Sequence, residues 1–346
     1  MQALDSTKGR RYEENCLVKI DNPFLEDRTR IYQTPSYRRL GSKTQVMPSP
    51  EDFYIRRRLS HTQEVDSLGI RISESLGLNT SLCEAIATGH DIGHAPYGHL
   101  GESVISEIIG KPFHHNVASV VVLQHVENRG KGCNLSFETL EGILYHSRSN
   151  SREIKASLNV PHEYNVVMNA DKIAYTSSDI NDAIRSGYLF EDKLPDFILR
   201  LGKTQEERDM KIVKALIEES KRTGKVQLSE GEVARDFNLT RNFMFDNVYH
   251  KIDNTINRAI LRKIYDFFSG ESYFKDNRID PLIGLVLLTD EECNRIGQMM
   301  MGSKKFNIED LKQFSLFGYL SNFSNKKIDF LDPDLNWGKD RVGKEI

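Results

Sequence analysis

Apolar residues recur at intervals of three or four positions along most of this chain, and this spacing constrains its fold more than any other feature. In the stretch 60–77, Val65, Leu68, Ile72 and Leu76 follow the helix period, which predicts one buried side of an α-helix. The same spacing marks further stretches at 79–92, 100–109, 116–127, 136–147, 164–187, 207–222 and 255–270. We therefore predict an all-α protein.

Several local signals predict where these helices begin and end. Ser60 is a candidate N-cap with Gln63 at the capping-box position, and Gly77 is the expected helix stop. Residues 1–50 carry several prolines and are interpreted as an irregular arm, with one short helix around Ser36–Ser42. The stretch 232–241 is interpreted as a weak edge strand or loop, and 224–232 as a flexible connection.

The bulk composition excludes several classes of protein. The chain has 346 residues, 38% of them hydrophobic and 28% charged, and a net charge of -3. These values indicate a folded protein of about two domains or one large helical domain, without a global attraction to nucleic acid or anionic lipid. No apolar run approaches the ~18 residues of a membrane helix, and the N-terminus lacks the apolar segment of a signal peptide.

The four cysteines are far apart in the sequence and form no CxxC pair. They are Cys16, Cys83, Cys133 and Cys293. This spacing argues against a disulfide framework and against a thiolate zinc site. We therefore expect a cytoplasmic protein in a reducing compartment.

Histidine is concentrated in one part of the chain, with eight of the ten residues between His61 and His146. The pair His90–Asp91 ends a predicted helix, His61 lies on the preceding helix, and Asp171 lies on a long later helix. Imidazole and carboxylate ligands together suit Mn, Fe, Co, Ni or Zn better than Ca. Four such ligands leave positions in an octahedral shell for water or a substrate oxygen, as a catalytic metal requires.

Three segments that contain these residues resemble one known family. The segments RRRLSHTQEV (56–65), GHDIGHAPYGHLGE (89–102) and ADKIAYTSSDINDA (170–183) resemble the HD-superfamily deoxynucleoside triphosphate triphosphohydrolases, especially the bacterial dGTPase-like proteins. Further similar segments lie at 38–48, 113–122, 132–147 and 243–251. The resemblance implies an HD-domain helical bundle with additional C-terminal helices.

The resemblance also implies a division of the chain into three parts. Residues 1–50 would form an N-terminal arm, and 51–190 the HD metal-dependent phosphohydrolase core. Residues 191–346 would form a C-terminal helical region that completes the substrate pocket and makes oligomer contacts. The basic residues from Arg28 to Lys43 are expected at a contact between copies in a homo-oligomer.

Residue by residue, the resemblance assigns roles to three groups. The metal ligands would be His61, His90, Asp91 and Asp171, and they would bind a divalent ion (Mn, Mg, Fe, Co or Ni). The catalytic group would be His99 beside the α-phosphate, Glu102 to orient it, and the pocket histidines His94 and His115. The substrate group would be Arg58, Lys172 and Tyr175 on the phosphates, Asp179 near the sugar 3′-hydroxyl, Arg241 on the γ-phosphate, and Tyr249 under the sugar.

Some residues near these motifs have a simpler interpretation. His125, His146, His162 and His250 are interpreted as structural or surface residues. A helix-start role for His115 and a core role for Tyr175 or Tyr249 also remain open. The family usually has a glutamine after its N-terminal Arg-Leu pair, where this chain has Gly41, so a sugar contact at that position is not expected.

The activity implied by the resemblance is hydrolysis of deoxynucleoside triphosphates, with dGTP favoured. Water would attack the α-phosphorus, the 5′-oxygen would leave toward His99, and the products would be the deoxynucleoside and inorganic triphosphate. Two alternatives remain open. One is an HD phosphodiesterase or phosphatase acting on another nucleotide, and the other is a non-catalytic binder of nucleotides or of nucleic acid, single-stranded nucleic acid included.

Overall fold

The computed structural model describes residues 1–14, 20–47, 52–147, 159–252, 254–276, 279–302, 306–320 and 328–338. Within these ranges the chain forms helices and no strand, and only two isolated β-bridges occur, Arg10–Ser136 and Thr44–Arg57. The all-α prediction is therefore confirmed. Cys16 lies outside the described residues, and Cys83, Cys133 and Cys293 are buried free thiols.

The N-terminal helices run up to the long central helix α9. They are α1 (Pro23–Tyr32), α2 (Pro35–Arg39), α3 (Arg58–Leu76), α4 (Thr80–Gly89), α5 (His99–Ile109), α6 (His115–Val121), α7 (Glu127–Gly130), α8 (Phe137–Tyr145) and α9 (His162–Arg185). Helix α6 continues into a π-helical turn, Val122–Val126.

The remaining helices complete the C-terminal half. They are α10 (Asp196–Leu201), α11 (Gln205–Thr223), α12 (Gly231–Asn247), α13 (Thr255–Gly270), α14 (Ser272–Asp276), α15 (Pro281–Leu287), α16 (Asp290–Met301), α17 (Ile308–Leu311) and α18 (Ser315–Leu320). Short 3₁₀ turns lie at Leu40–Ser42, Glu191–Lys193, Tyr249–Lys251 and Asn336–Gly338.

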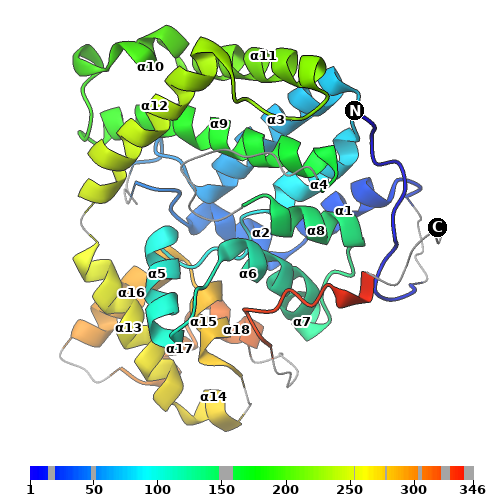
Figure 1. The fold of residues 1–346 in the computed structure, drawn as a ribbon. Helices are drawn as coiled ribbons and strands as arrows, with labels where there is room; N and C mark the ends of the chain where they lie inside the picture. The colour runs from blue at the N-terminus through cyan, green and yellow to red at the C-terminus, as the bar shows by residue number, and fades with distance from the viewer. Residues whose placement is uncertain are drawn as a thin grey trace.

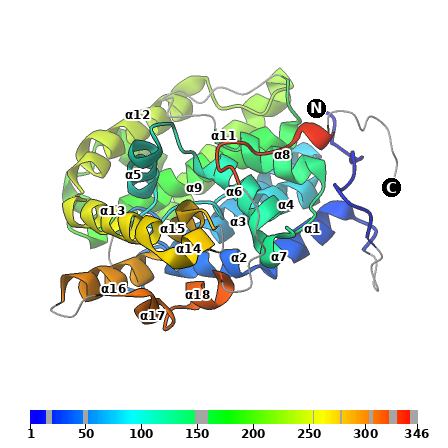
Figure 2. The same cartoon turned by 90° about the horizontal axis from the view of Figure 1, so that it is seen from below.

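The helices are arranged around a central group in which α3, α4 and α9 pack against one another (Figure 1). Helix α1 covers α4, and α11 packs against α9 and α3. Below this group, α13 packs against α5, α15 and α16, and Figure 2 shows these C-terminal helices from below. Helix α9 therefore lies between the N-terminal helices α3, α4 and α8 and the C-terminal helices α11 and α12.

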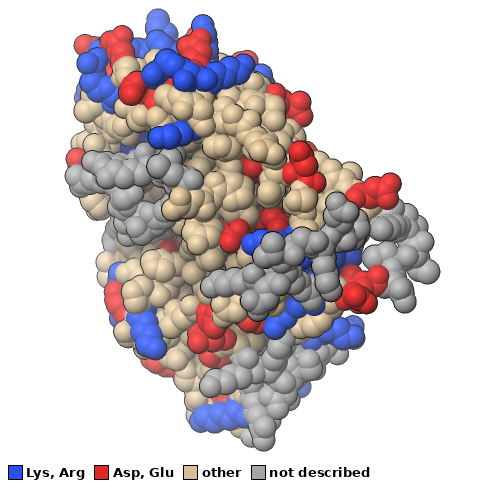
Figure 3. Space-filling model, turned by 45° about the vertical axis from the view of Figure 1, so that its right-hand side comes forward, with Lys and Arg blue, Asp and Glu red and all other residues tan. Residues whose placement is uncertain are grey.

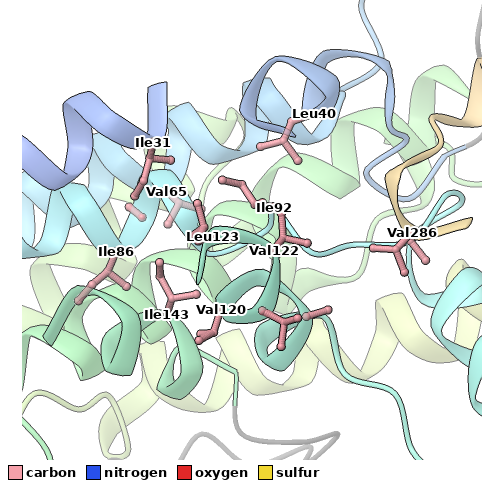
Figure 4. Close-up of a cluster of buried hydrophobic side chains, with 14 of the residues drawn as sticks. Ile31, Leu40, Val65, Ile86, Ile92, Val120, Val122, Leu123, Ile143 and Val286 are labelled. Atoms are coloured by element: carbon pink, nitrogen blue, oxygen red, sulfur yellow. The ribbon is translucent and has the colours of Figure 1, made fainter. Parts of the chain in front are cut away.

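A continuous apolar core fixes these helices relative to one another. Figure 4 shows Val65 of α3, Ile86 of α4 and Ile143 of α8 converging on one side of it, and each is fully buried. Val120 and Leu123 enter the core from α6 and the π-helical turn. Burial of apolar side chains is the main favourable term in folding, so this core sets the positions of the helix ends that surround it.

Two secondary-structure predictions are wrong. One concerns the residue that caps the start of α3, and the other concerns the N-terminal arm. Ser60 is not the N-cap of α3, because the helix begins at Arg58 and the Ser60 hydroxyl accepts the backbone N–H of Arg57. Residues 23–32 form α1, although the arm was predicted irregular there. Pro23 occupies the first turn of α1, where proline is tolerated, and the Asn22 side chain caps that turn.

The prediction for 232–241 is also wrong, because this stretch lies within the helix α12. Its buried residues Ala234, Phe237, Arg241 and Met244 recur at three- to four-residue spacing. This periodicity becomes visible only when the window extends beyond position 241, which explains why a ten-residue segment was misread. Gly77 does end α3, in the left-handed conformation.

The basic residues of the arm make contacts inside the chain rather than forming a free surface. Arg28 forms ion pairs with Asp66 and Glu84, and Arg39 pairs with Glu292 of α16. The expected role of these residues in contacts between copies stays a prediction.

The surface shows no segregation of charge over the face drawn in Figure 3. At the upper end, where α10 and α11 lie, lysine and arginine mix with aspartate and glutamate. Among the described residues, no helix combines the length and apolarity needed to cross a membrane.

Candidate active site

Three of the predicted metal ligands meet where α3, the end of α4 and α9 approach one another. The ring nitrogens of His61 and His90 and a carboxylate oxygen of Asp171 lie within 4.8 Å of one another. His61 Nε2 lies 3.0 Å from Asp171 Oδ1. Burial alone would raise the pKa of Asp171, but the hydrogen bond and charge of His61 lower it below its ordinary value. Asp171 is therefore ionised and able to bind a cation at neutral pH.

The orientation of His90 is set by its own helix. His90 follows the last residue of α4, and its Nδ1 lies 2.6 Å from the carbonyl oxygen of Ala87. The proton is therefore on Nδ1, and the lone pair of Nε2 points into the site. The side chain is fully buried, and Nε2 has no hydrogen-bonding partner among the described residues. A buried nitrogen of this kind is what a metal ligand presents before the ion binds.

The loop after His90 packs tightly against α6. Ser119 of α6 accepts the backbone N–H of Gly93 at 2.8 Å and donates to the carbonyl of His90 at 2.7 Å. A Cβ at Gly93 would lie 2.1 Å from the backbone nitrogen of Ser119. Only glycine allows this approach, and the approach fixes His90 and Asp91 relative to His115 of α6.

Asp91 lies beside this group and is paired with Arg58, the first residue of α3. Arg58 Nη1 donates to Asp91 Oδ2 at 2.7 Å, and both side chains are buried. Asp91 Oδ1 lies 3.5 Å from His90 Nε2 and 3.2 Å from His94 Nε2. Burial opposes ionisation of Asp91, but the charges of His90, Arg58 and His94 bring its pKa well below the ordinary value. Arg58, expected on a phosphate, thus orients a predicted metal ligand in this structure.

Glu102 connects the three remaining histidines of the predicted catalytic group. Its Oε1 lies 2.6 Å from His115 Nδ1 and 3.1 Å from His94 Nδ1. Its Oε2 lies 3.7 Å from His99 Nδ1. Burial would raise the pKa of Glu102, but the charge and hydrogen bond of His115 hold it well below its ordinary value. Glu102 is therefore a carboxylate that positions imidazoles.

The three histidines around Glu102 differ in their exposure. His94 stacks on His115 with ring centroids 3.9 Å apart, and both are buried. Burial and the nearby Arg58 lower the pKa of His94 to about 3, so it is neutral. The side chain of His99 is 72% exposed. Of the three, only His99 faces the solvent side from which a substrate would approach.

His146, interpreted from sequence as structural, also lies in this cluster. It follows the last residue of α8, is fully buried, and has Nε2 3.2 Å from His115 Nε2. Its ring centroid lies 5.0 Å from that of His90. Its segment, 132–147, is one of those that resemble the family, but the contact with His115 depends on how α8 packs against α4 and α6.

Four of the predicted substrate residues lie together on α9, α12 and the turn that follows α12. Asp171, Tyr175 and Asp179 are spaced by four residues, so they share one face of the helix. Arg241 of α12 donates from Nε to the Tyr175 hydroxyl at 3.1 Å. The Tyr249 hydroxyl donates to Asp179 Oδ2 at 2.7 Å. Lys172 is a half-buried residue of α9, next to Asp171.

This substrate face has its own electrostatic character. Burial raises the pKa of Asp179 to about 7, although the hydrogen bond from Tyr249 opposes the shift. Near neutral pH Asp179 is therefore able either to donate a hydrogen bond to a hydroxyl or to accept one from it. Arg241 is buried and supplies the fixed positive charge of this face.

The donor set fits a borderline divalent cation. It combines buried imidazole nitrogens with ionised carboxylates, and one of its nitrogens, His90 Nε2, lacks a partner. A separate surface hollow of about 530 Å³ is lined by Tyr12, Glu14, Asn128, Lys131 and Asn134, together with glycines. It contains no histidine and one carboxylate, so we assign the chemistry to the histidine cluster.

Comparison with known proteins gives a consistent result. Residues 58–176 match the HD domain family. Three similar curated proteins are each named "Deoxyguanosinetriphosphate triphosphohydrolase-like protein". The protein of Clostridium tetani is 39% identical over 278 residues, covering 78% of this chain and 79% of the relative. That of Caldanaerobacter subterraneus is 38% identical, covering 76% of each chain. That of Clostridium perfringens strain 13 is 42% identical, covering 71% and 72%.

Proposed function

This chain belongs to the family of deoxyguanosinetriphosphate triphosphohydrolase-like proteins and carries an HD domain. We propose that it hydrolyses deoxynucleoside triphosphates, dGTP among them, to a deoxynucleoside and inorganic triphosphate. The observation that carries this proposal is that one helix, α9, holds both a predicted metal ligand and predicted substrate residues. Asp171 of the ligand group and the substrate residues Tyr175 and Asp179 lie on one face of that helix, so a bound cation and a bound nucleotide would be adjacent.

The proposed metal ligands are His61, His90, Asp91 and Asp171. A divalent ion bound there supplies a Lewis acid for phosphate oxygens and lowers the pKa of water. Arg58 orients Asp91 from the opposite side, since it occupies Oδ2. Fixing the direction of a ligating carboxylate in this way is the usual task of groups behind a metal site.

The residues on the open side provide contacts for the triphosphate and the sugar. Lys172, Tyr175 and Arg241 would bind phosphate oxygens, and arginine suits forked contacts with phosphate. Asp179 and Tyr249 would contact the sugar, because they already form a hydrogen-bonded pair one helical turn beyond Tyr175. The nucleotide would thus lie along α9, with its α-phosphorus nearest Asp171.

Proton transfer is proposed for the group around Glu102. The exposed imidazole of His99 would donate a proton to the leaving 5′-oxygen, with Glu102 as its orienting carboxylate. His94 and His115 would support this arrangement from the buried side, because both lie within 3.1 Å of Glu102 Oε1. In this proposal the metal group lies on one side of the α-phosphorus, and the exposed His99 lies on the side of the leaving oxygen.

The proposal is tested by incubating purified protein with each dNTP and each NTP in the presence of Mn²⁺, Mg²⁺ or Co²⁺. We expect inorganic triphosphate and the deoxynucleoside from dNTPs, identified by ion-exchange chromatography and phosphorus NMR. Pyrophosphate with a nucleoside monophosphate would indicate a different HD hydrolase. Nucleotide binding without turnover under any of these metals would indicate a non-catalytic binder.

A further inference from the structure

Helix α5 begins at His99, directly after a turn whose backbone conformation is unfavourable. Tyr97 and Gly98 both have a φ angle of 59°, in the left-handed region that residues with a side chain rarely adopt. A Cβ at Gly98 would lie 2.6 Å from Nη2 of Arg58, so the close approach explains the glycine. Tyr97 has no comparable reason, and its conformation persists only if surrounding groups hold it.

Asp290, the first residue of α16, is a group that holds this turn. Its Oδ1 accepts the backbone N–H of Tyr97 at 2.8 Å, and its Oδ2 accepts the backbone N–H of Thr44 at 2.8 Å. The residue is buried. Because each carboxylate oxygen binds a backbone N–H, the direction of the side chain is fixed, and hydrogen bonds to a carboxylate are stronger than those to a neutral acceptor.

Tyr97 is attached to the same helix at its other end. Its hydroxyl donates to Asn294 Oδ1 at 2.7 Å. Asp290 and Asn294 are four residues apart on α16, so they lie on one face of that helix. Both the backbone and the side chain of Tyr97 are therefore bound to α16. Since His99 follows only two residues later, α16 sets where α5 begins.

The other contacts of α5 lie further along the helix. Val104 and Ile105 are fully buried and fix the body of the helix. Near its end, Glu107 pairs with Arg258 of α13, but both side chains are about two-fifths exposed, and exposed ion pairs contribute little. These contacts lie one turn or more beyond His99. The turn before His99 therefore governs the direction of its side chain.

On the premise of the proposed function, in which His99 protonates the leaving oxygen, we propose that Asp290 is a positioning residue for His99. It acts through the backbone of Tyr97 and needs no contact with the substrate. Its effect should appear in kcat, because a misplacement of about 1 Å in a reacting group can cost about 10²-fold in rate. Nucleotide affinity should change little, since Tyr175 and Arg241 lie on other helices.

A competing route for Asp290 runs through its second oxygen and Thr44. The carbonyl oxygen of the neighbouring Gln45 accepts Nη2 of Arg58 at 3.1 Å, and Arg58 donates to Asp91. If Asp290 acted mainly along this route, its removal would disturb Asp91 and lower the metal content of the protein. The route through Tyr97 would leave the metal content unchanged.

A double-mutant cycle distinguishes the two routes. Asp290→Asn is made in the wild type and in His99→Asn, and hydrolysis of dGTP and bound manganese are measured in each protein. In the wild-type background we expect kcat to fall by about 10- to 100-fold, with KM and manganese content unchanged. In the His99→Asn background the same substitution should change kcat by less than about twofold.

The matched control is Asp280→Asn, at the start of the preceding helix α15. Asp280 caps that helix and accepts the backbone N–H of Leu282 at 2.8 Å. Its substitution therefore also removes a carboxylate from a helix N-terminus, without touching the turn before His99. We expect this variant to keep the kcat of the wild type.

Three results would overturn the positioning role while leaving the proposed function intact. The first is a folded Asp290→Asn protein with the kcat of the wild type. The second is an equal fall of kcat in both backgrounds, because Asp290 would then act independently of His99. The third is a loss of manganese from Asp290→Asn, which would establish the route through Arg58.

A second measurement needs no activity. In Asp290→Asn the peptide that contains the Tyr97 amide should exchange hydrogen for deuterium several-fold faster than in the wild type, and the imidazole NMR signals of His99 should shift. Unchanged exchange and unchanged signals would overturn the positioning role. If the wild type produces no triphosphate from any dNTP, the proposed function fails, and this measurement still decides whether Asp290 holds the turn.

Because Asp290 is buried, circular dichroism must show that its variant is folded, and a milder variant covers the case in which it is not. Tyr97→Phe removes only the hydroxyl that binds Asn294. It should lower kcat less than Asp290→Asn is expected to, and the fall should disappear in the His99→Asn background. A folded Tyr97→Phe protein with wild-type kcat and wild-type His99 signals would contradict the proposal.

Discussion

Two ends of the candidate site are built in different ways. The histidine end consists of side chains from the first 150 residues: His61, His90, Asp91, His94, His99, Glu102, His115 and His146. The nucleotide end consists of Tyr175 and Asp179 of α9 with Arg241 and Tyr249 from the end of α12 and the turn after it. Asp171 on α9 joins the two ends through His61.

The difference concerns the kinds of side chain that each end brings together. Most groups of the histidine end are buried and have several partners, and Glu102 alone lies close to three imidazoles. The nucleotide end brings together phenol hydroxyls, a carboxyl group and a guanidinium, and its hydrogen bonds between α9 and the α12 region include Arg241 with Tyr175 and Tyr249 with Asp179. We infer that the histidine end determines the chemistry, for which exact placement matters, and that the nucleotide end determines affinity and substrate choice.

The largest effect is expected at the residue that joins the two ends. Asp171→Asn should remove a metal ligand while preserving the shape of the side chain. Loss of several kcal/mol of transition-state stabilisation corresponds to a fall in kcat of about 10³-fold or more. Activity and bound metal are measured together, with the exposed Asp192→Asn as control. Retention of both activity and metal in Asp171→Asn would remove this residue from the site.

A smaller effect is expected for the exposed histidine of the histidine end. His99→Asn should lower kcat by about 10²-fold or more, the contribution of one general acid, with metal content and melting temperature unchanged. The neighbouring control is His114→Asn, since His114 is also exposed and precedes His115. Equal activity in both variants would mean that another group protonates the leaving oxygen.

At the nucleotide end the effect should appear in KM. Arg241→Gln removes a charged hydrogen-bond donor, which is worth about 1.5–3 kcal/mol, so KM for a dNTP should rise by about 10- to 100-fold. The change in kcat should be much smaller, because the histidine end is intact. A fall in kcat with unchanged KM would show that the division between the two ends is wrong.

The smallest effect on turnover is expected at Lys43, behind the histidine end. Lys43 Nζ donates to the carbonyls of His94 and Val286, and burial with nearby Arg39 lowers its pKa to about 7. At this position the unfolded chain therefore binds more protons than the folded chain between about pH 7 and pH 10.5, so the contribution of Lys43 to stability rises with pH across this range. Lys43→Met should abolish that rise in denaturant unfolding measured at pH 7 and pH 9. Equal slopes in both proteins would contradict the assignment.

The sequence was sufficient for part of this description. The helix period predicted the all-α class, and the motifs around His61, His90 and Asp171 predicted residues that the structure brings within 4.8 Å. Such predictions succeed because the period and the motif spacing are local properties of the chain. The beginnings of helices were less predictable, because proline breaks a helix in its interior but is favourable in its first turn. Pro23 occupies the first turn of α1.

Contacts that depend on tertiary packing could not be predicted. The position of His146 depends on α8 lying against α4 and α6, so the sequence alone did not place it beside His115. The pairing of Arg58 with Asp91 was also missed, because the motif suggested only a phosphate contact. A sequence motif identifies residue types, whereas the direction in which each side chain points is set by the core beneath it.

The central claim, hydrolysis of a dNTP by water attack at the α-phosphorus, is tested most directly in water enriched in ¹⁸O. Phosphorus NMR of the products should show one ¹⁸O atom on a terminal phosphorus of inorganic triphosphate, and mass spectrometry should show an unlabelled deoxynucleoside. Label in the nucleoside 5′-hydroxyl, or label in pyrophosphate or orthophosphate without triphosphate, would contradict the account.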